Sequence, residues 1–100
     1  MAPPKLRRLD PRQAGRLRAA QTKVNAALPG AHNQLEAAEK AERAAAKRMI
    51  RRGAPGDVEA WERAATTTER AQRRVRALES AAGRLGQIDA AQRRPGLPYR

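Results

Sequence analysis

Gly53-Ala54-Pro55-Gly56 separates two long segments that are rich in strong helix formers such as Ala, Arg, Glu and Leu. Glycine and proline placed together in this way end regular structure and mark a turn. Asp57 follows as a suitable N-cap for a new helix. The residues after it predict a helix over residues 58–93, which ends before Pro95.

The segment after the turn carries the clearest helical register in the chain. Its seam residues recur at alternating spacings of three and four, as the contact between two packed helices requires: Trp61, Ala64, Thr68, Ala71, Val75, Leu78, Ala82 and Leu85. The segment before the turn predicts a second helix over residues 31–52, with Leu35, Ala38, Glu42, Ala45 and Met49 at the same spacings. Glu42 is a poor residue for an apolar seam, so we expect this helix to be twisted or only partly buried there.

A short turn between two long helices makes them antiparallel. Residues 31–52 and 58–93 are therefore predicted to form a long helical hairpin with a coiled-coil-like seam. In that hairpin Met49 lies near Trp61, beside the turn, and Leu35 lies further away, near Val75 and Leu78. The large side chains expected to hold the seam, or to join it to a second copy, are Leu35, Met49, Trp61, Val75, Leu78 and Leu85.

The beginning of the chain adds an arm and a further helix to this prediction. Residues 1–9 contain two prolines and several basic residues, and they are expected to form an extended basic arm. Asp10 and Pro11 are favourable as N-cap and first helical residue. The helix that they begin is expected over residues 11–28 and ends at Pro29-Gly30, because proline lacks the amide donor and clashes with the preceding turn. It folds back as the third member of a three-helix bundle or extends across a second subunit.

Composition supports an all-α fold and limits the size of its core. One hundred residues allow one small domain, here residues 10–93, followed by a flexible tail over residues 94–100. Of the hydrophobic residues 23 are Ala, and only 17 are larger. They fill a thin seam between helices rather than a thick core, so we expect modest stability as a monomer or stabilisation by self-association or a partner.

Positive charge is the strongest indication of function. Lys and Arg number 22 against 10 Asp and Glu, which gives a net charge of +12, and residues 1–28 hold half of it. A basic arm and helix of this kind predict salt-dependent contacts to phosphates that carry no sequence specificity. The residues expected to make these contacts are Lys5, Arg7, Arg8, Arg12, Arg16, Arg18 and Lys23. A high-GC genome also produces an excess of Arg and Ala, so composition alone does not establish a function.

A second basic row is expected to be part of an ordinary solvated surface. Arg63, Arg70 and Arg84 share one heptad position in the helix over residues 58–93. Glu59 is placed to pair with Arg63 four residues later, and Glu69 is placed to pair with Arg73 in the same way. This surface is therefore predicted to carry mixed charge.

Other classes of function lack the residues that they need. The chain has no Cys and a single His, which excludes thiolate chemistry and a multi-histidine metal site, and no catalytic residues or cofactor are predicted. Base stacking on single strands needs aromatic residues, and the chain has one Trp, one Tyr and no Phe. No apolar run approaches the length of a membrane span, and MAPPKLRRLD lacks the apolar stretch of a signal peptide, so a cytoplasmic location is expected.

These observations favour a small non-enzymatic basic helical protein that binds nucleic acid largely through phosphate contacts. Both DNA and RNA fit this prediction. The alternative is a helical structural or adaptor protein, which self-assembles as a homo-oligomer or binds an acidic protein surface.

Overall fold

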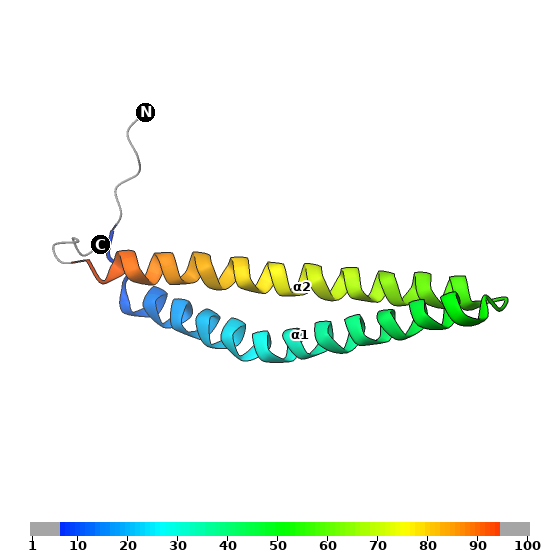
Figure 1. Cartoon of the computed structure of the whole chain (residues 1–100). Coiled ribbons are helices and arrows are strands. Elements are labelled where there is room, and N and C mark those ends of the chain that lie inside the picture. Colours follow the sequence, from blue (N-terminus) through cyan, green and yellow to red (C-terminus); the bar gives the residue numbers. More distant parts are fainter. Residues whose placement is uncertain (1–6, 95–100) are drawn as a thin grey trace, which may run out of the picture.

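The computed structural model describes residues 7–94 and shows a long hairpin of two antiparallel helices (Figure 1). Helix α1 extends over Pro11–Arg52 and helix α2 over Asp57–Gln92. The predicted all-α hairpin and its turn are confirmed. Helix α2 begins and ends one residue before the predicted bounds of 58–93. Lys5 and residues 95–100, which belong to the predicted arm and tail, lie outside the described residues.

The start of α1 is fixed by a capping box at Asp10. The Asp10 carboxylate accepts a hydrogen bond from the Gln13 amide at 2.8 Å, and the Gln13 side chain accepts one from the Asp10 amide at 3.2 Å. Pro11 occupies the first helical position, where its missing amide proton costs nothing because no intrahelical acceptor exists there. The predicted helix start is therefore confirmed.

The predicted break at Pro29-Gly30 is wrong. Helix α1 is continuous from Pro11 to Arg52, with Pro29 inside it, so residues 7–94 form two helices and not a three-helix bundle. Pro29 and Gly30 are both exposed, and water can satisfy the carbonyl that loses its partner to proline. The proline bends the helix instead of ending it, and Figure 1 shows α1 bowed away from α2 near residue 30.

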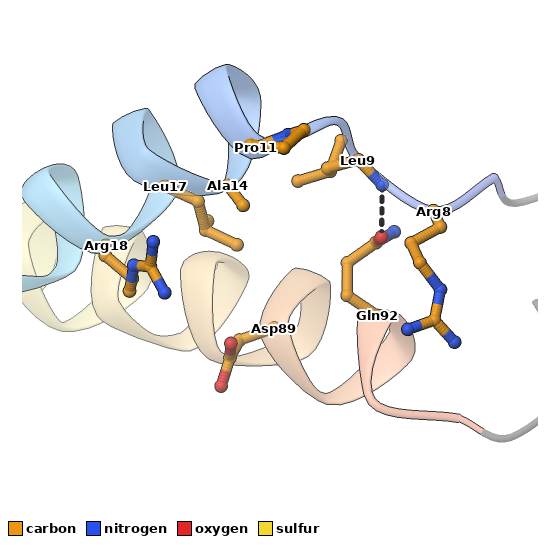
Figure 2. A pocket seen from close by; sticks show the side chains of 8 residues that line it. All are labelled: Arg8, Leu9, Pro11, Ala14, Leu17, Arg18, Asp89 and Gln92. Carbon is orange, nitrogen blue, oxygen red and sulfur yellow. Dashed lines mark hydrogen bonds between the residues drawn. The ribbon is translucent and has the colours of Figure 1, made fainter. Parts of the chain in front are cut away.

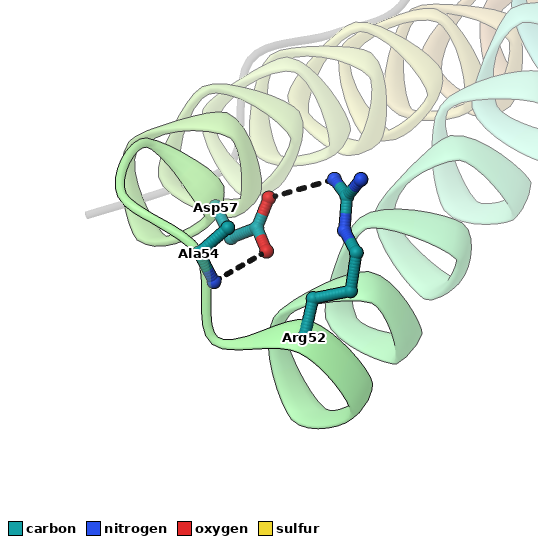
Figure 3. A network of polar contacts seen from close by, with 3 residues as sticks. All are labelled: Arg52, Ala54 and Asp57. Atoms are coloured by element: carbon teal, nitrogen blue, oxygen red, sulfur yellow. Dashed lines mark hydrogen bonds and ion pairs between the residues drawn. The ribbon is translucent and has the colours of Figure 1, made fainter.

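The turn is built from two glycines and a buried carboxylate. Figure 3 shows the contacts of this carboxylate. Gly53 and Gly56 have φ values of 56° and 91°, in the left-handed region that side chains disfavour. Asp57 is the first residue of α2 rather than its N-cap, and it is only 7% exposed. Its carboxylate accepts hydrogen bonds from the Ala54 amide at 3.0 Å and from Arg52 Nη2 at 3.2 Å. Asp57 therefore joins both helices to the turn.

Replacing Asp57 with Ala is expected to lower the free energy of unfolding by about 1.5–3 kcal/mol, the usual range for hydrogen bonds to a charged group. The substitution leaves the Ala54 amide without its acceptor and removes the partner of Arg52. Urea denaturation followed by circular dichroism measures this loss. Asp57→Asn keeps an oxygen acceptor and should lose less. An unchanged urea midpoint in Asp57→Ala would show that the carboxylate does not stabilise the turn.

At the other end of the hairpin, the segment before α1 is attached to the end of α2 (Figure 2). The Gln92 side chain accepts a hydrogen bond from the Leu9 amide at 2.6 Å and donates one to the Arg7 carbonyl at 2.8 Å. A pocket of about 270 Å³ lies beside this contact, with Arg8, Leu17 and Asp89 among its lining residues. This volume is slightly smaller than that of typical small-molecule sites.

The core of the hairpin is a thin line of small residues. Ala31, Ala38 and Ala45, each seven residues apart, are buried on α1, and Thr68 and Val75 are buried on α2. No described side chain is less than 2% exposed. The Thr68 hydroxyl donates a hydrogen bond to the Ala64 carbonyl at 3.1 Å, so its polar atom is satisfied inside the seam.

The remaining large seam residues are half-buried, and the molecule is elongated. These residues are Leu35, Met49, Trp61, Leu78 and Leu85. The radius of gyration is 21.2 Å, against about 13 Å for a compact domain of this length. The accessible surface of 7993 Å² also exceeds the roughly 5,600 Å² expected of a compact monomer of this mass.

Candidate nucleic-acid interface

The two antiparallel helices give the hairpin two long faces. Seven residues make almost two full turns of an α-helix, so residues at heptad intervals lie on the same face. A groove on one face is lined by residues of both helices, which include Gln34, Ala37 and Ala41 of α1 and Thr67, Arg70 and Arg74 of α2. We call the surface formed by these six residues and by their heptad-related positions in α1 and α2 the alanine face.

A polar contact between the two helices marks the opposite face. His32 Nε2 of α1 lies 3.6 Å from Glu79 Oε1 of α2. We call this opposite surface the glutamate face. It is formed by His32, Glu36, Glu69, Glu79 and the positions one or more heptads away from them in α1 and α2, and it includes Arg93, which directly follows α2. The seam between the helices separates the two faces. The rest of the surface of the hairpin is formed by the outer sides of α1 and α2, which point away from each other.

The alanine face carries cations and no carboxylates over Pro11–Arg52 and Asp57–Gln92. Its exposed basic residues are Arg16, Lys23, Arg48 and Arg51 of α1 and Arg63, Arg70, Arg74 and Arg84 of α2. The other positions of this face are mostly Ala. None of its basic residues forms an ion pair with a carboxylate in the described part of the chain, and Arg84 donates only a long hydrogen bond of 3.5 Å to the Ser80 hydroxyl. No ion pair within the described part of the chain thus neutralises their positive charge.

The glutamate face has a mixed composition. Its acidic residues are Glu36, Glu39, Glu62, Glu69 and Glu79, and its arginines are Arg18, Arg43, Arg76 and Arg93. Two of these residues take part in ion pairs along α2: Glu69 with Arg73 at 3.6 Å and Arg93 with Asp89 at 2.9 Å. Charge is therefore segregated between the two faces although it is mixed along the sequence.

The residues predicted to contact nucleic acid are divided by the fold. Arg16 and Lys23 lie on the alanine face, whereas Arg18 lies on the glutamate face and Arg12 on the outer side of α1. Arg7 is exposed and Arg8 is half-buried, both just before α1. Lys5 is outside the described residues. The predicted group thus does not form one surface.

The structure adds six cations that the sequence prediction left out of the interface: Arg48, Arg51, Arg63, Arg70, Arg74 and Arg84. The heptad row of Arg63, Arg70 and Arg84 is visible in the sequence, but a mixed surface was expected there. The expected pair of Glu69 with Arg73 is present at 3.6 Å, and Arg63 and Arg70 share a shallow hollow with Glu59 and Glu62 on the outer side of α2. Glu69 falls on the opposite face, so Arg70 and Arg74 face the groove without an acidic neighbour among its lining residues.

Other kinds of site find little support in the described residues. Residues 7–94 hold no group of three or more His, Asp or Glu side chains that could bind a metal ion. Neither α1 nor α2 has an apolar stretch that could cross a membrane. Comparison of the chain with protein-family models, with curated protein sequences and with solved structures finds no match.

Proposed function

We propose that this chain is a non-enzymatic protein that binds nucleic acid through phosphate contacts made by the alanine face. The observation that supports this proposal is the set of exposed cations, contributed by both helices, on a face without carboxylates in α1 and α2. Each phosphate that is neutralised releases condensed counterions, so affinity comes from the number of contacts and not from base sequence.

The shape of the alanine face suits a polyanion that lies along the hairpin. Cations one heptad apart on a helix are separated by about 10 Å along its axis, and the molecule is 67 Å long. The Ala side chains between them are short, so they do not obstruct the longer Arg and Lys side chains. Residues of both helices line the groove at the centre of this face, where the cations come from α2. Helix α1 contributes its cations near the two ends of the hairpin, Arg16 and Lys23 at one end and Arg48 and Arg51 at the other.

We further propose that the ligand is double-stranded. Single-strand binders stack bases on exposed aromatic side chains. Trp61, the one aromatic residue among residues 7–94, is half-buried in the seam and does not belong to the alanine face. Contacts to the backbone of a duplex need no aromatic platform.

A matched pair of triple variants tests the proposal. Arg70→Gln, Arg74→Gln and Arg84→Gln together remove three cations from the alanine face. Arg18→Gln, Arg43→Gln and Arg76→Gln remove three from the glutamate face, and all six arginines are exposed. Both proteins have the same net charge. Fluorescence anisotropy with a labelled duplex should show at least about tenfold weaker binding for the alanine-face variant. Equal weakening in both variants would show that net charge, and not this face, determines binding.

A second candidate function is binding to an acidic helical protein. The observation that favours it is the groove of about 530 Å³ on the alanine face, whose lining includes Ala37, Ala41 and Ala71 beside Arg70 and Arg74. An apolar floor contributes to helix docking and little to phosphate binding. Duplex binding that stays undetectable at low salt would favour this function over the first.

A further inference from the structure

We infer that the glutamate face is a homodimer interface, on which a second copy of this chain packs. The inference rests on burial, exposed apolar side chains and charge, and it does not depend on the ligand of the alanine face. In the dimer the two hairpins form a four-helix assembly, and their alanine faces point outward on opposite sides. Such an interface is isologous, because the same surface of each copy contacts the other.

Burial is the first observation. The whole chain, of which the hairpin is the described part, exposes 7993 Å², which is about 2,400 Å² more than a compact monomer of equal mass would expose. The two helices together present a face about 50 Å long and about 20 Å wide. Packing on such a face covers on the order of 1,000 Å² per copy, and a stable interface needs about 800 Å² per partner.

Exposed apolar side chains are the second observation. Ile50 is 81% exposed and Val58 is 49% exposed, and both lie on the glutamate face beside the turn. Ala46 of α1 and Ala65 of α2 are half-buried on the same face. These two small side chains allow another helix to approach closely. Among the described residues Ile88, 44% exposed, is the one large apolar residue of comparable exposure that lies on the alanine face.

Charge is the third observation, and it indicates which face a second copy of this chain can contact. A second copy also carries a net charge of +12, so most of its surface is repelled by the first. Two alanine faces cannot pack together without bringing cations into contact. The glutamate face holds both signs, with Glu36, Glu62 and Glu79 among its acids and Arg43 and Arg76 among its bases. It is the face on which two like-charged copies can meet with their opposite charges paired.

The test is the mass of the full-length protein in solution, measured by light scattering after size exclusion over a dilution series. The wild type is expected at twice the 11.0 kDa of one chain. Ile50→Asp combined with Val58→Asp places two carboxylates on the glutamate face and should reduce the mass to that of one chain. Ala44→Asp combined with Ala77→Asp makes the same charge change at exposed positions of the alanine face and should remain dimeric.

A wild-type protein that stays at 11.0 kDa at every concentration would overturn the inference. So would equal dissociation of both variants, or dissociation of the Ala44→Asp and Ala77→Asp variant alone. Circular dichroism confirms that each variant is helical before its mass is interpreted. Duplex binding of the wild type separates this inference from the proposed function: a wild type that binds duplex but stays at 11.0 kDa contradicts the dimer alone, and a dimeric wild type that does not bind duplex contradicts the proposed function alone.

Discussion

Replacing Val75 with Asp is expected to unfold the hairpin. Val75 is 5% exposed and occupies the seam of α2. A carboxylate held there loses its hydration without gaining a partner, and the penalty for such an ion is several kcal/mol even after relaxation. Small domains have a total stability of about 5–15 kcal/mol, and a core made largely of Ala places this protein toward the lower end. Far-UV circular dichroism should show loss of most helical signal at room temperature.

Ala77→Asp is the matched control for this substitution. It introduces the same charge two residues further along α2, at an exposed position. Its cost is limited to the lower helix propensity of Asp, which is about 0.7 kcal/mol at most. A Val75→Asp protein that melts at the same temperature as Ala77→Asp would contradict a seam centred on Val75.

Replacing Pro29 and Gly30 with Ala is expected to stabilise the protein by about 2–4 kcal/mol. Proline inside a helix costs up to about 3 kcal/mol and glycine about 1 kcal/mol relative to Ala. Both residues are exposed, and a Cβ added at Gly30 meets no atom within 4 Å. The Pro29→Ala change also restores the amide donor that the helix lacks at this position. Urea denaturation should show a higher midpoint at an unchanged slope.

Gly83→Ala separates the glycine contribution from the proline contribution. Gly83 is exposed in α2 and also has open space around its missing Cβ. It should add about 1 kcal/mol and no more. If the Pro29→Ala and Gly30→Ala variant were less stable than the wild type, the bend at Pro29 would be needed to keep the two halves of α1 on α2.

The hairpin could be predicted because its signals are local. The glycines and proline of the turn and the spacing from Trp61 to Leu85 are read directly from the chain. The continuity of α1 could not be predicted from the sequence alone, because the cost of Pro29 depends on its tertiary setting. Val24, Leu28, Ala31 and Leu35 keep alternating spacings of four, three and four across the proline. Both halves of α1 therefore face α2 in one register, and packing on a single long partner compensates for one bent turn.

The charged face could be predicted only in part, because it is a property of the folded pair. Along the sequence the cations are densest in the first 28 residues, and the predicted interface is therefore placed there. Antiparallel packing instead groups them by heptad position, so Arg16 and Lys23 of α1 share a face with Arg70 and Arg84 of α2. The same geometry places the glutamates that lie between these cations in the sequence outside the alanine face. A heptad assignment of both helices in one register is the step that would have found this face.

The dependence of duplex binding on salt tests the central claim most directly, since each phosphate contact contributes about 0.9 to the slope of log K against log salt concentration. We expect a steep slope for the wild type, a slope smaller by about 2.7 when Arg70, Arg74 and Arg84 are changed to Gln, and an unchanged slope when Arg18, Arg43 and Arg76 are changed. Binding that does not respond to salt, or equal slopes for the two triple variants, would contradict a phosphate-binding alanine face.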